Sequence, residues 1–133
     1  MLTRREEREQ AFILLFEKSF NEDIAVPELY EMAVEPEIIA ESDFSKNLAI
    51  KVTENLGAID ASIEKHSVKW KMNRISKVAL AVMRLAICEI LFYDDIPVGV
   101  SINEAVELCK KYASKDDYAF VNGILSSAAK EEK

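Results

Sequence analysis

The sequence predicts an all-α fold, on three observations. The 133 residues include only three glycines and three prolines, whereas a β-sandwich needs many turn residues. Apolar residues recur at spacings of three and four along most of the chain, which is the period of an amphipathic helix. No segment of useful length has the two-residue period of a strand. We therefore expect helices joined by short connections.

The first helix is predicted to run from Thr3 to about Phe20. Thr3 and Glu6 form a T-x-x-E capping box, in which each side chain accepts a hydrogen bond from the other residue's backbone N–H. A short second helix is predicted with Pro27 in its first turn, ending before Pro36.

A third helix is predicted to begin at Ser42 or Asp43, either of which can cap it. Its apolar face continues to Ile63, with Gly57 as a candidate kink. For residues 67–76 we predict a short helix or a connecting turn.

A central helix is predicted from Lys77 to Tyr93, because this segment is apolar on nearly all sides and must be covered by its neighbours. Arg84 and Glu89 are exceptions within it, and we expect them to reach buried or rim partners in a structural role.

Two further helices complete the chain. Ser101 and Glu104 form an S-x-x-E pattern that predicts a second capping box. The last helix is predicted to begin near Asp116 or Asp117, whose carboxylates suit a helix N-terminus. Gly123 inside it costs about 1 kcal/mol relative to alanine, which predicts a close approach of another helix there.

The composition is that of a globular protein, with 50% hydrophobic and 31% charged residues. A chain of this length fits one domain, or two small subdomains sharing a core. Cys88 and Cys109 lie in apolar helical runs, so we expect buried thiols in a reducing compartment. We find no apolar run long enough for a signal peptide or a membrane span, and we expect a cytoplasmic protein with no membrane association.

The net charge of −7 is unevenly distributed. Residues 1–20 are neutral, residues 21–64 carry −9, residues 65–84 carry +6 and residues 85–133 carry −4. A nucleic acid could therefore bind only at a local basic patch, with strong dependence on salt.

Residues for catalysis, a cofactor or a metal are not recognisable. His66 is the only histidine, and we expect it to be an exposed surface residue because no nucleophile motif surrounds it. The three glycines are isolated, so no phosphate loop is predicted. The two cysteines lack the spacing of a metal site. We expect a protein that is not an enzyme.

Two groups of cationic residues are candidates for RNA contact. Arg4, Arg5 and Arg8 lie on the opening turns of the first helix, although composition alone favours their pairing with Glu7 and Glu9 over contact with RNA. The window 65–84 contains six basic residues, no acidic ones and Trp70. Such a pattern suits single-stranded RNA, but we favour a core tryptophan with lysines at its rim.

The order of motifs along the chain resembles the NusB family of bacterial transcription antitermination factors. The resemblance spans nearly the whole chain and is most specific in its last two motifs. The motifs are an arginine-rich start, Trp70 with Arg74-Ile75, the segment 82–90, Ile102-Asn103-Glu104-Ala105 and Phe120-Val121-Asn122-Gly123.

The resemblance implies about seven helices in two packed subdomains, at about residues 1–66 and 67–133. It implies a protein that binds boxA RNA together with the ribosomal protein NusE and promotes read-through by RNA polymerase, chiefly on ribosomal RNA operons. Carried over by motif, Phe16 would contact NusE. The RNA-binding residues would be Arg4, Arg5, Arg8, Asp116, Phe120 and Asn122.

One departure from the family concerns Ala79-Leu80, where many relatives carry an acidic–basic pair. This departure puts the detail of NusE contact in doubt, and we expect it to expose apolar surface that favours a homodimer. Two alternatives stay open: an accessory RNA-binding domain like those of rRNA methyltransferases, which the end of the chain at Lys133 speaks against, and a storage homodimer that masks the RNA surface.

Overall fold

A computed structural model describes residues 1–68 and 70–132, with side chains as far as Glu131. Lys69, which belongs to the predicted basic window, and Lys133 lie outside the described residues. Within that part of the chain the fold is all-α, as predicted, and residues 72–74 form one short 3-10 turn, η1. The seven α-helices are α1 (Arg4–Lys18), α2 (Val26–Val34), α3 (Asp43–Glu54), α4 (Leu56–His66), α5 (Lys77–Phe92), α6 (Val98–Tyr112) and α7 (Lys115–Glu132).

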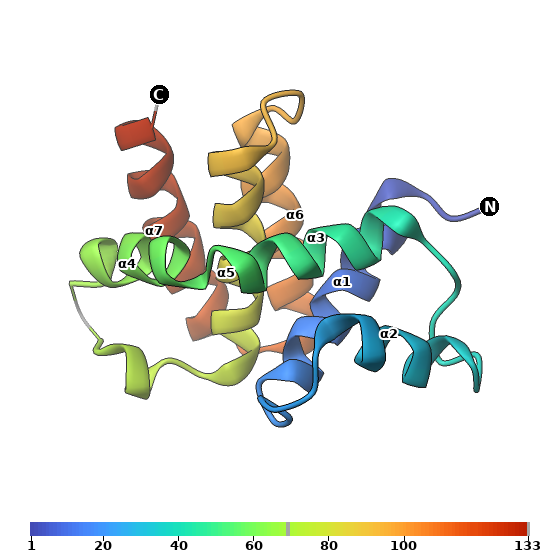
Figure 1. Cartoon of the computed structure of the whole chain (residues 1–133). Helices are drawn as coiled ribbons and strands as arrows, with labels where there is room; N and C mark the ends of the chain where they lie inside the picture. Colours follow the sequence, from blue (N-terminus) through green and yellow to red (C-terminus); the bar gives the residue numbers. More distant parts are fainter. Residues whose placement is uncertain (69, 133) are drawn as a thin grey trace.

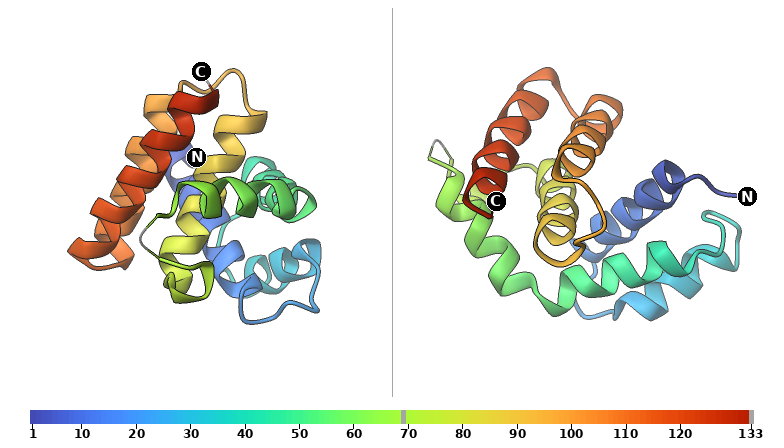
Figure 2. Two further views of the ribbon diagram at one scale, coloured as in Figure 1. Left: turned by 90° about the vertical axis from the view of Figure 1, so that its left-hand side faces the viewer. Right: turned by 90° about the horizontal axis from the view of Figure 1, so that it is seen from above.

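Helix α5 lies at the centre of the molecule, as its apolar sequence predicted. It contacts α1, α3, α4, α6 and α7 (Figure 1, Figure 2). Ten of its sixteen residues are buried, and all of them except Glu89 join one apolar cluster to which the other six α-helices also contribute. Helices α6 and α7 pack against each other on one side of α5, while α1, α2 and α3 pack together on the other.

Several helix ends are set by the predicted residues. The capping box of Thr3 and Glu6 is present at the start of α1. Ser42 caps α3 by accepting a hydrogen bond from the Ser45 N–H at 3.1 Å. The prediction of Pro27 in the first turn of α2 is also confirmed.

The predicted continuous helix from Ser42 to Ile63 is wrong, because Asn55 divides it into α3 and α4. The Asn55 side-chain amide donates to the Lys51 carbonyl at 2.9 Å. An asparagine that bonds the backbone in this way competes with helical hydrogen bonding. The interruption therefore lies at Asn55, two residues before the candidate kink at Gly57.

The predicted second capping box is wrong too. Helix α6 begins at Val98, with Pro97 as its N-terminal flanking residue, so Ser101 and Glu104 lie inside the helix and are buried. Proline suits the start of a helix because its missing N–H would have no partner there. Ser101 and Glu104 are consequently free to bond other helices.

Candidate nucleic-acid interface

The first turn of α1 presents two exposed arginines. The capping box orients this turn, and hydrogen bonds from Thr3 hold the pKa of the Glu6 carboxyl below its usual value. The Arg4 guanidinium lies 3.8 Å from the centre of the Phe44 ring, a cation–π contact. It also lies 3.8 Å from a Glu7 carboxylate oxygen, so part of the predicted pairing with glutamates is present.

Arg5 bridges α1 to α6. Its guanidinium donates two hydrogen bonds to Glu104, at 3.0 and 2.8 Å, the bidentate geometry that makes an arginine–carboxylate pair specific. The Arg5 side chain is nevertheless 64% exposed. Its free edge can therefore meet another anion.

Arg8 differs from its two neighbours because its charge is buried. Its side chain is 6% exposed and donates to Glu89 on α5 at 2.7 Å, where the Glu89 side chain is fully buried. The Ser101 hydroxyl donates to the other Glu89 oxygen at 2.6 Å. The structure thus gives Arg8 a role in joining α1 to the core, and confirms the structural role expected for Glu89.

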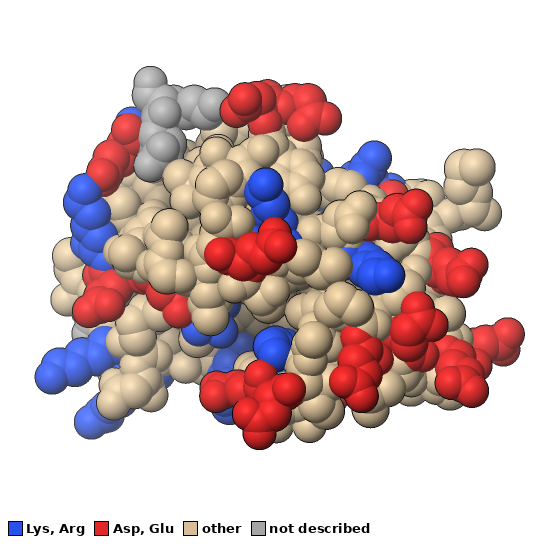
Figure 3. All heavy atoms as spheres, viewed as in Figure 1, with Lys and Arg blue, Asp and Glu red and all other residues tan. Residues whose placement is uncertain are grey.

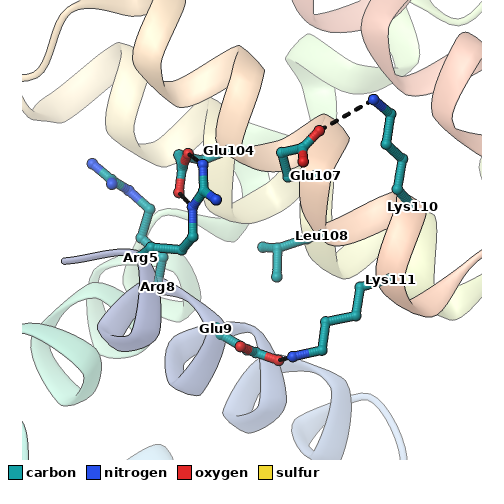
Figure 4. Close-up of a pocket in the computed structure, with 8 residues that line it drawn as sticks. All are labelled: Arg5, Arg8, Glu9, Glu104, Glu107, Leu108, Lys110 and Lys111. Carbon is teal, nitrogen blue, oxygen red and sulfur yellow. Dashed lines mark hydrogen bonds and ion pairs between the residues drawn. The ribbon is translucent and has the colours of Figure 1, made fainter. Parts of the chain in front are cut away.

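A cleft of about 420 Å³ separates the start of α1 from α6 (Figure 4). Its lining contains four cations and three carboxylates, together with Leu108: Arg5, Arg8, Lys110, Lys111, Glu9, Glu104 and Glu107. Figure 4 shows Lys111 reaching from α6 across to Glu9 on α1, while Lys110 points along α6 toward Glu107.

The cations of this cleft are paired yet accessible. Lys110 lies 3.2 Å from Glu107, and Lys111 lies 2.6 Å from Glu9. A hydrogen bond to Glu9 raises the pKa of Lys111. Burial raises the pKa of Glu9, but hydrogen bonds from Lys111 and Tyr112 more than offset this and leave that pKa low. The lysine side chains are 53% and 61% exposed, so both can exchange a carboxylate for a phosphate.

The predicted residues of α7 lie on two faces of the helix. Asp116 is exposed in the first turn, and with the half-buried Phe120 it lines a second cleft of about 230 Å³ that also includes Trp70 and Arg74. Asn122 is exposed four residues after Tyr118, which places those two side chains on a common face. Lys110 lies 5.6 Å from the centre of the Tyr118 ring, so this face adjoins the lysines of the first cleft.

Two predictions in this region are wrong. Trp70 is 47% exposed, not a core residue, because its connection crosses the surface between α4 and α5. A methyl group added at Gly123 would meet nothing within 4 Å, so that glycine marks no close helix approach.

Sequence reasoning missed Lys110 and Lys111. Their adjacency in the last turn of α6 predicts only a favourable interaction with the helix dipole. Their approach to Arg5 depends on the packing of α6 against α1, which no spacing in the sequence reveals.

The predicted partner residue, Phe16, is half-buried within a row of aromatic side chains. Its ring lies 6.0 Å from Phe12 and 5.1 Å from Phe20, measured between ring centres. Phe20 is 58% exposed. Ala79 is buried and Leu80 half-buried, so the departure from the family exposes less apolar surface than predicted.

The histidine and the cysteines hold structural positions. His66 is half-buried, not exposed as predicted, because Ser62 and Glu131 bond its two ring nitrogens. Cys88 and Cys109 are buried free thiols, as predicted, and burial raises the pKa of each to about 12.

Among the residues that the structure describes, no three histidine, cysteine or acidic residues are grouped to hold a metal ion. Across the same residues, no helix is long and apolar enough to cross a membrane.

Comparison with known proteins identifies close similarity along the whole chain. A sequence model of the NusB family matches residues 5–130. The transcription antitermination protein NusB of Natranaerobius thermophilus is 40% identical over 98% of this chain and 96% of its own. That of Ruminiclostridium cellulolyticum is 43% identical over 96% of this chain and 88% of its own.

Solved structures agree with the sequence comparison. T. maritima NusB superposes with a TM-score of 0.83 at 38% identity, covering 98% of this chain and 92% of that one. A chain from a crystal structure of the antitermination factors NusB and NusE in complex with double-stranded RNA gives a TM-score of 0.85 at 30% identity, covering 96% of each chain.

Proposed function

The chain belongs to the NusB family, and from this membership we propose that it is an RNA-binding transcription antitermination factor. It binds the boxA segment of nascent RNA together with NusE and promotes read-through by RNA polymerase, chiefly on ribosomal RNA operons. It acts by binding partners, not by catalysis. Support comes from relatives that are antitermination proteins and from a similar chain solved with NusE and RNA.

The cleft between α1 and α6 is the observation that carries this proposal. Arg5, Lys110 and Lys111 converge there from two helices, each more than half exposed, in a chain of net charge −7. Phosphate contacts from lysine and arginine supply most of the affinity of proteins for RNA backbones. The phosphates would lie along this cleft, with Arg4 beside it.

Asn122 and Arg8 enter the proposal in different ways. Asn122 shares a face with Tyr118, whose ring meets Lys110, so it extends the cationic surface onto α7. Arg8 is buried against Glu89. We therefore assign Arg8 the role of holding the start of α1 in place, so that Arg4 and Arg5 can contact phosphates, and no direct phosphate contact of its own.

Partner contact is assigned to the aromatic row of Phe12, Phe16 and Phe20. An exposed phenylalanine beside a half-buried one offers the apolar contact typical of protein interfaces. NusE would dock on Phe16 and Phe20, on the opposite end of α1 from Arg4.

The test is a titration of labelled boxA RNA, with and without NusE, against a scrambled RNA of the same length. Substituting Arg5→Ala and Lys110→Ala together should weaken boxA binding and reduce the slope of log K against log salt by about 1.4, since each lost phosphate contact removes about 0.7 for a single strand.

The matched control is the pair Lys46→Ala and Lys51→Ala on α3, which removes two cations outside the cleft. It should leave affinity and slope nearly unchanged. Equal binding to the boxA and scrambled RNAs would remove sequence-specific recognition from the proposal.

A further inference from the structure

An apolar groove lies between α1 and α2. It measures about 240 Å³, which is less than the roughly 300–1,000 Å³ of pockets that enclose small molecules. Its lining comes from α1, from α2 and from the segment after α2: Ile13, Leu14, Glu17, Leu29, Met32, Ala33 and Ile38. The groove therefore suits a few apolar side chains of another protein better than a small molecule.

Two large apolar side chains of this groove are exposed. Met32 is 55% exposed and Ile38 is 69% exposed. Ile38 is held in place, because its N–H donates to the Ala33 carbonyl at 2.9 Å where the chain turns back after α2. Methionine is common at surfaces that adapt their packing to a partner. The groove thus presents apolar surface that the fold itself leaves uncovered.

The surface around the groove is strongly acidic. Residues 19–45 contain no lysine or arginine, and eight acidic residues: Glu22, Asp23, Glu28, Glu31, Glu35, Glu37, Glu41 and Asp43. Carboxylates gather over α2 at the lower right of Figure 3. Across the part of the chain that the structure describes, the ion pairs use other carboxylates. The negative charge around α2 is therefore available to the cations of a partner.

The charges at the end of α2 are unfavourable for the helix dipole. The last turn of α2 contains no basic residue, and Glu35 and Glu37 follow it, at the end of a helix where a cation is stabilising and a carboxylate is not. Glu37 also has a φ of 61°, in the left-handed region that favours glycine. Positive charge from a partner would offset the unfavourable electrostatics at this end of α2.

The groove is separate from the faces assigned to RNA and NusE. Phe12 packs on Tyr112 of α6, with 4.9 Å between the ring centres, and Phe16 lies on the same face of α1 four residues later. At about 3.6 residues per turn, Leu14 lies on nearly the opposite side of α1 from Phe12. An acidic surface also repels the phosphates of RNA. The groove is therefore suited to a protein other than the partners already assigned.

We propose that this groove is a docking site for a basic amphipathic helix of a partner protein, which inserts apolar side chains between Met32 and Ile38 and directs its lysines and arginines toward the surrounding carboxylates. Recognition of a helix in a groove uses apolar anchors at spacings of three and four residues. Complementary charge around such anchors speeds association and selects the partner. The proposal goes beyond the RNA-binding function and does not depend on it.

The experiment uses a synthetic helical peptide of about 18 residues, or five turns, with leucine on one face and lysine on the others. The reporters are the methyl groups of the four methionines, labelled with carbon-13 in the full chain and followed by NMR. The Met32 signal should shift as peptide is added. The signals of Met72, in η1, and of Met83, which is fully buried in α5, should not shift.

One pair of variants tests the apolar anchor. Ile38→Asn should weaken peptide binding about tenfold, because the peptide no longer buries an isoleucine side chain. Val68→Asn replaces another exposed apolar side chain, outside the groove, and should leave the affinity unchanged. Both substitutions are at exposed positions, and circular dichroism checks that each variant is folded.

A second pair of variants tests the acidic rim. Glu17 lines the groove, and Glu35 lies three residues after Met32, on a neighbouring part of α2. Glu17→Gln with Glu35→Gln should weaken peptide binding about fivefold at low salt and reduce its dependence on salt. Glu54→Gln with Glu64→Gln makes the same change in net charge outside the groove and should have a smaller effect. A peptide with glutamate in place of lysine should not bind.

Each other outcome contradicts the proposal. No shift of the Met32 signal, or equal binding by the glutamate peptide, would overturn the docking site or its preference for a basic helix. Competition between the peptide and NusE would assign the groove to NusE. A concentration-dependent dimer in analytical ultracentrifugation that Ile38→Asn dissociates would make a second copy of this chain the occupant in place of a basic partner.

Discussion

His66 Nε2 lies 2.9 Å from a carboxylate oxygen of Glu131, which ties the end of α4 to the last turn of α7. Lys65 contacts the second oxygen of the same carboxylate. The other ring nitrogen of His66 lies 2.8 Å from the Ser62 carbonyl oxygen. The two ring nitrogens of His66 thus contact one oxygen on their own helix and one on α7.

Glu131→Gln should make the thermal stability less dependent on pH in the acid range. Hydrogen bonds from Lys65 and then His66 lower the pKa of the folded Glu131 carboxyl, so its contribution is present above its unfolded pKa and is lost as the pH falls through the folded pKa. Circular dichroism melts from pH 7 to pH 3 should show a Tm difference between wild type and variant that shrinks toward acid. Glu64→Gln, on α4, is the control. A Tm difference between wild type and Glu131→Gln that does not change with pH would contradict a stabilising role for the contacts of Glu131 with Lys65 and His66.

Arg8→Met should destabilise the fold by about 3–5 kcal/mol, because it leaves the buried Glu89 carboxylate without its cation. Urea unfolding measures this loss. The double variant Arg8→Met with Glu89→Gln should recover part of it, since a neutral amide is less costly to bury than an unpaired charge. Arg4→Ala, at an exposed site, should cost less than about 1 kcal/mol. A small loss for Arg8→Met would show that the buried pair contributes little.

Glu104→Gln should tighten RNA binding. Glu104 occupies one edge of the Arg5 guanidinium and competes with phosphate for it. Arg5 is 64% exposed and Glu104 only 11%; taking the range of about 0.2–1 kcal/mol for pairs open to solvent as a lower bound, we expect an affinity at least about two- to fivefold higher at low salt, measured by RNA polarisation. Glu54→Gln on α3 is the control for the change in net charge. Weaker binding by Glu104→Gln would show instead that Glu104 holds Arg5 in position.

Gly123→Ala should stabilise the fold by about 0.5–1 kcal/mol. Alanine is the better helix former by about 1 kcal/mol, and the structure leaves open space for its methyl group. Chemical denaturation measures the gain. Val121 lies two residues before Gly123 and is fully buried. Val121→Ala is the control, and it should lower the free energy of unfolding because it removes packed atoms from the same helix. A loss for Gly123→Ala would contradict the open space that the structure leaves for the methyl group.

The sequence predicted the parts of the fold that local chemistry decides. The caps at Thr3 and Ser42 and the apolar run of α5 depend only on neighbouring residues, and each was correct. Ser101 and Glu104 have the spacing of a capping box but bond to Glu89 and Arg5, residues far away in the chain. No local pattern separates those two uses of the same spacing.

The candidate site also combines features that neighbouring residues decide with features that tertiary packing decides. The exposure of Arg4 and Arg5 could be predicted from their position in the first turn, but the burial of Arg8 depends on Glu89 in α5. The exposure of Trp70 likewise depends on how one connection crosses the surface. Tertiary packing decided which residues of each predicted group can reach a ligand.

The uneven distribution of charge along the sequence separates charges of opposite sign on the surface of the molecule. Carboxylates gather over α2 and the segments on either side of it, at the lower right of Figure 3, while cations gather at the opposite edge. A polyanion that comes within about 8 Å, the screening length at physiological salt, exerts a torque on such a molecule. The protein therefore turns its cationic edge toward RNA before contact, and its acidic face discourages a second strand from binding behind it.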